Sequence, residues 1–481
     1  MSDGNGSSFT RADLLRGGAA FGALAALGPA AALAQGGSTR SAAMGNVGAL
    51  SLFNSATLNG EALFSYGATA YGTAEIGEIA TIALRINTRS GNPETPTTRT
   101  FDIYVEEFSR FAAMLERAAR DALAKGQRVS ARSKFLRASS YYAQALFFVL
   151  GTSRPAREPN IFRACERNWL AAVPLFDPPG EVLEITTSAG VKMPAYFFRP
   201  DASGEPRPTV IVCNGSDGQN VDLVSQGQAA GLARGYNVLL FEGPGQMSPL
   251  FLDEIPFPPD WSGVVAPIVE TLVARPDVDS DGIAAIGISL NGMVLSSAAA
   301  RVGGLAAIVL QPGAVSLGNL WGDQRSITAV REAQGAPAAV RAQIRREVNA
   351  GVKQAWPTLN AEERFLISKR GELYTRQQLL DARAGRPPSD YVGLLEAVLA
   401  FNYGQDLRRI AVPTLVTHNQ DDQFMKNQSP WAFRLLTSLA PADKQLEFLG
   451  ASIGGQLHDQ PVGPQVGQEI VFDWLGERLG V

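Results

Sequence analysis

The sequence predicts an α/β protein whose core is a mostly parallel, eight-stranded sheet with helices on both faces. From about residue 181 onward, short runs rich in β-branched residues are bounded by Gly, Pro, Asn or Asp, and helical stretches separate most of them. Strands spaced by amphipathic helices form parallel sheets that are covered on both sides. The predicted strands are 182–187, 193–198, 209–213, 237–241, 282–288, 306–310, 414–417 and 445–449.

The connections between these strands are predicted from turn and helix signals. Ser188-Ala189-Gly190 separates the first two strands and is typical of a hairpin turn. Apolar residues recur at helical spacing in four later connections, which are 223–234, 263–274, 292–302 and 465–479. The long interval between the sixth and seventh strands contains only helical patterns, at 337–350, 361–369 and 390–403. We therefore predict a helical cap inserted at about residues 314–408.

The segment that precedes the sheet is predicted to be a helical domain. Apolar and small side chains recur at helical spacing from residue 101 to residue 125, and Gly126 ends the pattern. A second helix is predicted from residue 130 to residue 150, before Gly151. The expected organisation is an amino-terminal helical domain at residues 41–180, followed by the sheet domain with its cap at residues 181–481.

The first residues have the layout of an export signal. Arg11 and Arg16 precede an apolar stretch rich in Ala and Gly, and Ala32-Leu33-Ala34 offers a small-x-small cleavage site. The stretch resembles a twin-arginine signal, with Ala12 where the second arginine is expected. We predict a signal peptide and linker at residues 1–40 and a periplasmic or secreted protein. The alternative is a frayed amino-terminal helix, and the protein is cytoplasmic if the signal does not function.

The composition argues against several classes of partner. The net charge is −4, and no run of lysines and arginines suggests nucleic acid or an anionic membrane surface. The two cysteines, Cys165 and Cys213, are too few for a disulfide framework or a cysteine-built metal site. The two histidines, His418 and His458, are too few for a typical zinc site. We therefore expect no metal, no cofactor and no membrane span in the mature chain.

Ser289 lies in the sequence context of a nucleophile elbow. The predicted strand 282–288 leads into Ser289-Leu290-Asn291-Gly292, and a helix rich in small residues follows. A sharp strand–turn–helix connection exposes the serine hydroxyl above the edge of the sheet. It also directs the backbone N–H of Leu290 toward a developing oxyanion. Asn291 departs from the usual motif, which has glycine at this position, so its side chain must find space or reach solvent.

A closer literal match to the G-x-S-x-G motif surrounds Ser452, in the segment Gly450-Ala451-Ser452-Ile453-Gly454. This segment follows the last predicted strand, and no apolar helix begins there. No later strand remains that could supply an acidic partner. Because structural context decides the value of a short motif, we predict Ser289 and not Ser452 as the nucleophile.

The candidate acid and base follow the nucleophile in the chain. Asp422 lies in a polar turn after the seventh predicted strand, on the edge of the sheet where ligands bind. We prefer it to Asp421, because the acid usually stands three residues after a turn residue, here Asn419. His458 lies between the last strand and the last helix. The other histidine, His418, lies at a strand end beside the acid, where a structural role is expected.

The order Ser289, Asp422, His458 is the order of nucleophile, acid and base in the α/β-hydrolase fold, which we therefore predict. In this mechanism His458 takes the proton of Ser289, and Asp422 holds the imidazole in the correct tautomer. The second oxyanion donor is expected in the glycine-containing loop after the third strand. The backbone N–H of Ser216 is the candidate, and Gly215 and Asp217 are predicted to support the site from the same loop.

Several segments resemble one family of α/β-hydrolases that carry an amino-terminal helical domain. It includes 2,6-dihydroxypseudooxynicotine hydrolase and the fungal polyketide-shortening hydrolases of pigment synthesis. The resemblance covers residues 60–480 and is carried by the block 132–148, the loop 214–218, the stretch Phe241-Glu242-Gly243-Pro244-Gly245-Gln246 and the elbow at Ser289. Glu242 matches a position that is often Asp in the family, where it supports the site or caps the turn.

The resemblance implies a Ser-Asp-His enzyme that holds its substrate between the helical domain and the sheet, and a homodimer. It also implies hydrolysis of a carbon–carbon bond next to a ketone, or of an ester. We therefore expect a serine hydrolase that acts through an acyl-enzyme on a small or medium carbonyl compound. The absence of propeller-like repeats before the elbow argues against a peptidase. An acyltransferase and a catalytically inactive binding protein are the alternatives.

Overall fold

The computed structural model describes residues 50–480, so the predicted export signal at residues 1–40 lies outside the described part of the chain. Its centre is an eight-stranded sheet with the strand order β1-β2-β4-β3-β5-β6-β7-β8. β2 pairs antiparallel with both β1 and β4, and the other neighbours are parallel, which confirms the predicted sheet. The strands are β1 Glu181–Thr186, β2 Lys192–Phe198, β3 Arg207–Cys213, β4 Asn237–Phe241, β5 Val278–Ile288, β6 Ala307–Gln311, β7 Thr414–Asn419 and β8 Lys444–Leu449.

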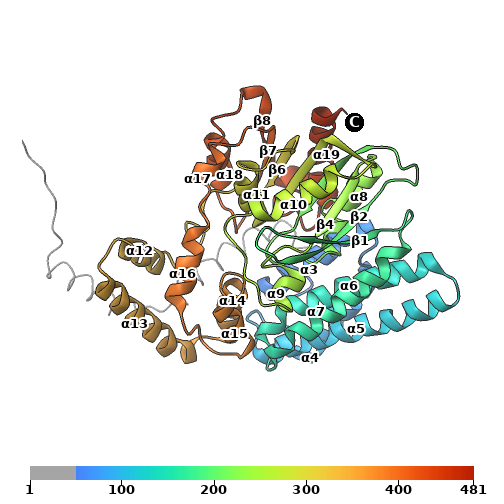
Figure 1. Cartoon of the computed structure of the whole chain (residues 1–481). Helices are drawn as coiled ribbons and strands as arrows, with labels where there is room; N and C mark the ends of the chain where they lie inside the picture. Colours follow the sequence, from blue (N-terminus) through green and yellow to red (C-terminus); the bar gives the residue numbers. More distant parts are fainter. Residues whose placement is uncertain (1–49, 481) are drawn as a thin grey trace, which may run out of the picture.

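Alternating side chains of the strands fill two cores, one on each face of the sheet. In β3, Ile211 and Cys213 belong to one core, while Val210 and Val212 belong to the other. Because such strands are buried on both faces, they read as continuous apolar runs in the sequence. Figure 1 shows the resulting layers. The first core includes α10 Ser262–Val273 and α11 Asn291–Ala299, and the second includes α8 Gln228–Ala233 and α19 Pro464–Leu479.

The amino-terminal region is helical, as predicted, and lies along one side of the sheet (Figure 1). Its α-helices between residues 50 and 180 are α3 Ala56–Ala68, α4 Ile76–Ser90, α5 Thr98–Ala124, α6 Arg128–Phe148 and α7 Glu158–Ala172. Aromatic side chains form their common core: the Tyr104 ring lies 4.6 Å from that of Phe108 and 4.7 Å from that of Phe148. This is the helix–helix packing that the periodicity of α5 and α6 predicts.

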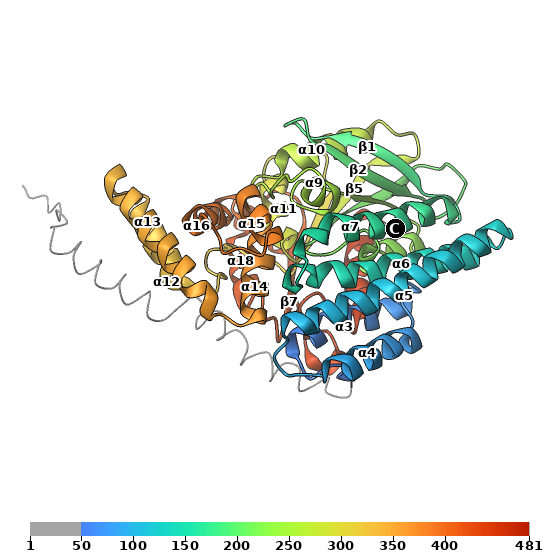
Figure 2. The same ribbon diagram turned by 90° about the horizontal axis from the view of Figure 1, so that it is seen from below.

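A run of helices connects β6 to β7 at the position of the predicted cap. They are α12 Gln324–Ala333, α13 Ala338–Ala355, α14 Ala361–Gly371, α15 Arg376–Arg383, α16 Tyr391–Ala400 and α17 Gly404–Leu407. Figure 2 shows α14 and α15 between α13 and the amino-terminal helices. The Phe365 ring of α14 lies 5.0 Å from that of Phe101 and 5.2 Å from that of Phe148. The cap is therefore packed against the amino-terminal helices.

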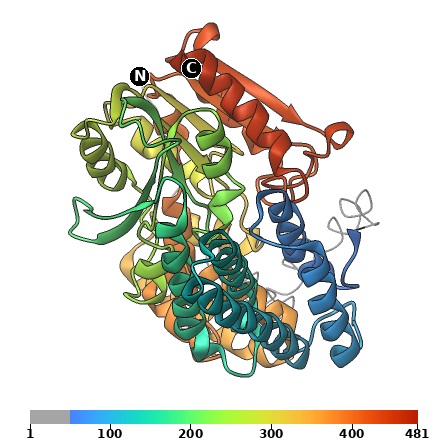
Figure 3. The same ribbon diagram turned by 90° about the vertical axis from the view of Figure 1, so that its right-hand side faces the viewer.

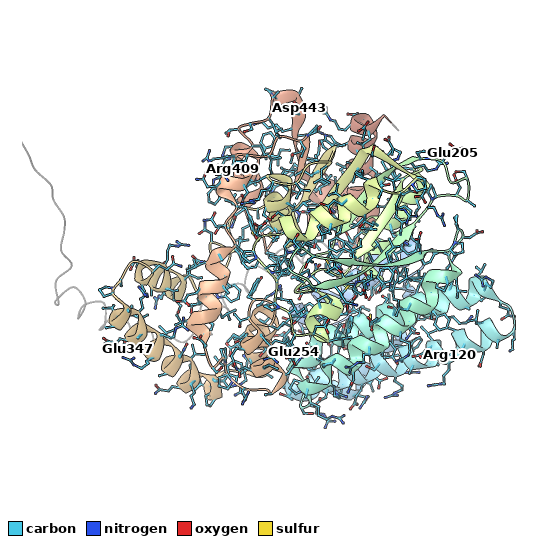
Figure 4. All side chains as sticks on the ribbon, viewed as in Figure 1. Arg120, Glu205, Glu254, Glu347, Arg409 and Asp443 are labelled. Atoms are coloured by element: carbon cyan, nitrogen blue, oxygen red, sulfur yellow. The ribbon has the colours of Figure 1, made fainter. Side chains whose placement is uncertain are left out.

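Most charged side chains lie on the surface, and several are buried. Arg120, Glu205 and Glu347 illustrate the first group at the periphery of the molecule (Figure 4). In contrast, Glu242, Lys369, Glu372, Asp422 and Asp459 are buried. Within residues 50–480, no helix is long and apolar enough to cross a membrane. Buried charges require partners, so each of these side chains is expected to have one close by.

Candidate active site

Ser289 occupies a strained turn between β5 and α11. Its φ angle is 52°, in the left-handed region that L-residues rarely adopt, and its N–H donates to the carbonyl of Gln311 at 2.7 Å. A Cβ atom at Gly287 would lie 2.2 Å from the carbonyl oxygen of Asn291, so only glycine allows this close approach. The turn projects the Ser289 hydroxyl beyond the carboxyl edge of the sheet, which is the geometry of a nucleophile elbow.

Three side chains from distant parts of the chain meet at this edge. Ser289 Oγ lies 2.9 Å from Nε2 of His458, and Nδ1 of His458 lies 2.8 Å from Oδ2 of Asp422. The other Asp422 oxygen accepts the backbone N–H groups of Phe424 at 2.8 Å and Met425 at 2.7 Å. These contacts fix the carboxylate, and the carboxylate in turn orients the imidazole with Nε2 toward the hydroxyl.

The surroundings of His458 favour its protonated form. Burial acts against the charge, but Asp422 and the neighbouring Asp459 outweigh burial and raise the pKa of His458 to about 9. Asp459 Oδ2 lies 3.2 Å from Nε2 of His458, on the same side as Ser289. Burial, together with Asp422 and Asp217, raises the pKa of Asp459 to about 6. The proton affinities of the two neighbouring groups are thus linked.

Two free backbone N–H groups flank Ser289. Among the described residues, neither the N–H of Leu290 nor that of Ser216 donates to a protein acceptor. A Cβ atom at Gly215 would lie 2.7 Å from Cβ of Ser289, so this glycine lets the loop after β3 reach the serine. Leu290, Gly215 and Ser216 all line the same cavity as Ser289. Their arrangement is compatible with an oxyanion hole.

Two buried amide side chains hold the loop after β3 in place. Asn291 Nδ2 donates to the carbonyl oxygen of Asn214 at 2.6 Å, and Gln246 Nε2 donates to the same oxygen at 2.7 Å. Gln246 Nε2 also lies 2.6 Å from the carbonyl oxygen of Gly215. Asn291 is fully buried and does not reach solvent. The residue that departs from the usual glycine therefore supports the loop that carries the N–H of Ser216.

The two acidic residues predicted to support the site differ in position. Glu242 does not line the cavity; its carboxylate accepts bonds from Tyr196 Oη at 2.8 Å and Asn220 Nδ2 at 2.7 Å, and it also contacts Ser248. Burial raises the pKa of Glu242. Asp217 lines the cavity and lies 3.4 Å from both Lys369 Nζ and Arg370 Nη1 of the cap helix α14. Glu242 thus organises the turn after β4, whereas Asp217 joins the loop to the cap.

The sequence offers other candidates for the nucleophile, the base and the acid, and none of them belongs to the group formed by Ser289, His458 and Asp422. Ser452 is exposed on a short 3₁₀ turn, Ala451–Ile453, and does not line the cavity. His418 contacts the Phe448 ring at 5.8 Å, and burial lowers its pKa. Asp421, next to Asp422, makes no side-chain hydrogen bond to another described residue. None of the three contacts Ser289 or His458.

A cavity of about 820 Å³ lies over Ser289 and His458. Its walls come from the amino-terminal helices, the cap and the loops at the edge of the sheet. Aromatic and aliphatic side chains dominate these walls, and its size lies in the range of small-molecule sites. The aromatic and aliphatic side chains on the walls include those of Phe64, Phe147, Leu317, Leu320, Trp321, Leu366, Tyr374, Tyr391 and Phe424. Several carboxyl groups also line the cavity, among them that of Glu61 of α3, whose pKa burial raises to about 8.

The family of the chain follows from a profile match. The sequence profile of the family described as X-Pro dipeptidyl-peptidase (S15 family) matches residues 189–448, more than half of the chain. The chain belongs to this S15 family. It is thus a hydrolase of the α/β fold, and the match extends from the hairpin through the elbow and the cap to β8.

Individual relatives of this S15-family chain are also named hydrolases. Hydrolase ORFZ of Pyricularia oryzae is 26% identical over 439 residues, covering 86% of this chain and 95% of that protein. Alpha/beta hydrolase psoB of Aspergillus fumigatus is 31% identical over 262 residues, covering 52% of this chain and 56% of that protein. The solved structure of 2,6-dihydroxy-pseudo-oxynicotine hydrolase matches with a TM-score of 0.57 at 19% identity, covering 86% of this chain and 95% of that one. This structural match confirms the predicted α/β-hydrolase fold with an amino-terminal helical region.

Sequence reasoning missed several residues of the S15-family site. Asp459 follows His458 directly, but an acidic residue after a histidine carries no motif. Lys369 and Arg370 lie in an ordinary helical pattern, where charges usually face solvent. Glu61 lies in a helix that the sequence did not delimit. Only the fold brings Glu61, Arg370 and Asp459 to the cavity wall and Lys369 to Asp217 beside it, although a Lys-Arg pair on an otherwise amphipathic cap helix is a weak signal.

Proposed function

We propose that this α/β hydrolase is a serine hydrolase that cleaves a small or medium, largely apolar carbonyl compound through an acyl-enzyme. The observation that carries the proposal is the continuous contact from Ser289 Oγ to His458 at 2.9 Å and from His458 to Asp422 at 2.8 Å, on the wall of an apolar cavity. Such a chain of contacts activates a hydroxyl that is otherwise a poor nucleophile.

In the proposed mechanism, Ser289 Oγ attacks the substrate carbonyl while Nε2 of His458 takes its proton. Asp422 keeps the imidazole in the required tautomer and stabilises the imidazolium. The negative charge that develops on the carbonyl oxygen is accepted by the N–H groups of Leu290 and Ser216. The leaving group departs, and water then attacks the acyl-enzyme with His458 as the base. Ser289 is regenerated and a carboxylic acid is released.

The substrate class follows from the cavity. Its aromatic and aliphatic walls favour an apolar body, and charged side chains on the same walls, among them Glu61, Arg370 and Asp459, can bind polar groups of the substrate. Two bonds suit this site, a carbon–carbon bond of a β-diketone-like compound or an ester bond. Both use the same nucleophile and base. The relatives named above are hydrolases, which is consistent with this proposal.

A hydrolysis screen with three variants tests the proposal. Aryl esters and 1,3-diketones are offered to the wild-type protein, to Ser289→Ala and to Ser452→Ala, which removes the exposed serine of the literal motif. We expect Ser289→Ala to lose at least about a thousandfold in kcat/KM, and Ser452→Ala to match the wild type. Labelling with a fluorophosphonate probe is expected on Ser289 alone.

Two outcomes contradict the proposal. If folded protein neither reacts with the probe nor hydrolyses any substrate, the chain is an inactive binding protein. If an added alcohol or amine takes the acyl group in preference to water, the protein is an acyltransferase. Product analysis with and without the acceptor separates this second case from hydrolysis.

A further inference from the structure

Asp459 is a second carboxyl group at the reacting end of the cluster, and the mechanism proposed above gives it no role. Its Oδ2 lies 3.2 Å from Nε2 of His458, the same nitrogen that lies 2.9 Å from Ser289 Oγ. Its other oxygen, Oδ1, is buried and has no hydrogen-bond partner among residues 50–480. Asp459 also lines the substrate cavity. A buried carboxyl oxygen without a hydrogen-bond partner lowers the stability of the fold, so its presence calls for an explanation such as a functional role.

Asp459 has a backbone conformation that L-residues rarely adopt, and neighbouring segments of the chain hold it there. Asp459 and Gln460 have φ angles of 57° and 49°, in the left-handed region. Gln226 Nε2 donates to the carbonyl of Asp459 at 3.2 Å, and Gly67 of α3 donates its N–H to the carbonyl of Pro461 at 3.1 Å. Figure 3 shows α3 beside this carboxyl-terminal segment. Backbone strain that neighbouring elements maintain is typical of functional positions.

We propose that Asp459 is a catalytic acid that protonates an enolate leaving group, which makes the enzyme a carbon–carbon bond hydrolase of β-diketone-like substrates. This inference rests on the proposed function and deepens it. An ester releases an alkoxide or phenolate at the carbonyl carbon, which the imidazolium of His458 can protonate directly. Cleavage of a carbon–carbon bond instead places the charge on an oxygen two bonds farther away, where a second acid beside His458 is in reach.

Two protons move in the proposed step, one from Ser289 to His458 and one from Asp459 to the leaving group. The pair shares one proton, which lies mainly on Nε2 of His458; the step starts from the minor form in which that proton has crossed to Asp459 and His458 is neutral. Ser289 adds to the carbonyl and its proton goes to His458; the carbon–carbon bond then breaks, its electron pair forms the enolate, and Asp459 gives its proton to the enolate oxygen. The product leaves as an enol. The proton on Nε2 of His458 then moves across the 3.2 Å contact to Asp459, which restores both groups for attack of water on the acyl-enzyme.

The charges around the pair support a shared proton near neutral pH. Asp459 faces His458 from its own loop, Asp422 from the loop after β7, Asp217 from the loop after β3 and Arg370 from cap helix α14. With the pKa of Asp459 raised to about 6 and that of His458 raised to about 9, the pair holds one transferable proton between these two pH values. Above about pH 9 the pair loses that proton, and Asp459 no longer has one to donate.

The test compares Asp459→Asn with wild type on two substrate classes. Asparagine tolerates the left-handed backbone and keeps the size of the side chain, but it cannot donate an acidic proton. We expect kcat/KM for a 1,3-diketone near neutral pH to fall about 100-fold, while the limiting kcat/KM for an aryl ester at alkaline pH, where His458 is neutral in both proteins, changes less than about threefold. Asp281→Asn, the same substitution at an exposed position of β5 on the amino-terminal side of Ser289, is expected to change neither rate.

The pH dependence gives a second, independent readout. In wild type, diketone cleavage is expected to fall above about pH 9, while ester hydrolysis continues to rise as His458 becomes neutral. In Asp459→Asn the residual diketone rate is expected to lose this alkaline fall. Circular dichroism and fluorophosphonate labelling of Ser289 verify that the variant is folded and that its nucleophile is reactive.

The outcomes separate failure of this inference from failure of the proposed function. If Ser289 is required but Asp459→Asn slows esters and diketones equally, Asp459 only positions His458. If the wild type hydrolyses esters and cleaves no 1,3-diketone, the proton-donor role is wrong and the serine mechanism stands. If Ser289→Ala keeps its activity, the proposed function itself is wrong.

Discussion

The side-chain amide of Asn291 donates a hydrogen bond to the main-chain carbonyl of Asn214 over 2.6 Å. This contact joins the turn that carries Ser289 to the loop that carries the N–H of Ser216. Gln246 donates to the same carbonyl oxygen from the turn after β4, at 2.7 Å. Two segments, the turn at Ser289 and the turn after β4, therefore fix one peptide group of the loop beside the candidate nucleophile. An oxyanion hole depends on such fixed positions, because its donors must be in place before charge develops.

Replacement of Asn291 by glycine, the residue of the usual elbow motif, tests this relationship. A glycine there fits the turn but cannot donate to Asn214, so we expect kcat to fall about tenfold and the free energy of unfolding to fall by about 1–2 kcal/mol. Hydrolysis rates and urea unfolding measure the two effects. The double variant with Gln246→Ala is expected to lose more than the sum of the single changes, since the Asn214 carbonyl then has neither donor. Strict additivity, or an unchanged kcat in Asn291→Gly, contradicts a role in fixing the loop.

The sequence predicts the framework of the site better than its electrostatics. Ser289, Asp422 and His458 follow strands at the edge of the sheet, and their order in the chain is a property of the fold that local context reveals. In the sequence Asn291 is only a departure from the motif, because its partner Asn214 lies 77 positions earlier in the chain. The contacts of Asp217 with Lys369 cross a still longer interval. Periodicity predicts which face of a helix is buried, but it does not predict which distant charge meets that face.

Lys369 is a buried cation that couples the cap to the loop after β3. Its ammonium lies 2.7 Å from Glu372 and 3.4 Å from Asp217. Burial acts to lower the pKa of Lys369, but these carboxylates outweigh burial and raise it. Lys369→Met leaves Glu372 without its cation in a buried site. We expect the free energy of unfolding to fall by about 3–5 kcal/mol, as measured by urea unfolding.

Two further variants distinguish a buried-charge effect from a loss of packing. Lys353→Met, at an exposed position of α13, is expected to change stability by less than about 0.5 kcal/mol. The double variant Lys369→Met, Glu372→Gln removes both buried charges, so we expect it to recover at least half of the loss. A double variant as unstable as Lys369→Met alone would show that the methylene packing of the lysine matters more than its charge.

Arg370 places a positive charge near His458. Its guanidinium lies 4.6 Å from the Phe424 ring centre, and that ring lies 4.8 Å from the His458 ring. A nearby cation disfavours the imidazolium, so Arg370 lowers the pKa of His458 against the effect of Asp422 and Asp459. In Arg370→Ala the rise of ester hydrolysis with pH is therefore expected to move to higher pH, by a few tenths of a pH unit. Arg376 is an exposed arginine of α15 that pairs with Glu254, and the control variant Arg376→Ala is expected to leave the pH profile unchanged. A shift toward lower pH in Arg370→Ala contradicts the assigned sign.

We expect Glu61 to make substrate binding sensitive to pH without taking part in the bond-breaking step. Burial raises its pKa to about 8, with Asp217 and Asp222 adding to the effect, so the group is mostly neutral at pH 7. Above pH 8 it becomes a carboxylate on the wall of a largely apolar cavity, and binding of an uncharged apolar substrate must then exclude water from a charge. We expect KM of the wild type to rise severalfold between about pH 7 and pH 9. Glu61→Gln resembles the protonated acid in size and hydrogen bonding, so its KM is expected to match the wild type near neutral pH and to stay level at higher pH. A wild-type KM that is constant across this interval, or a Glu61→Gln variant that retains the rise, assigns the pH dependence to another group.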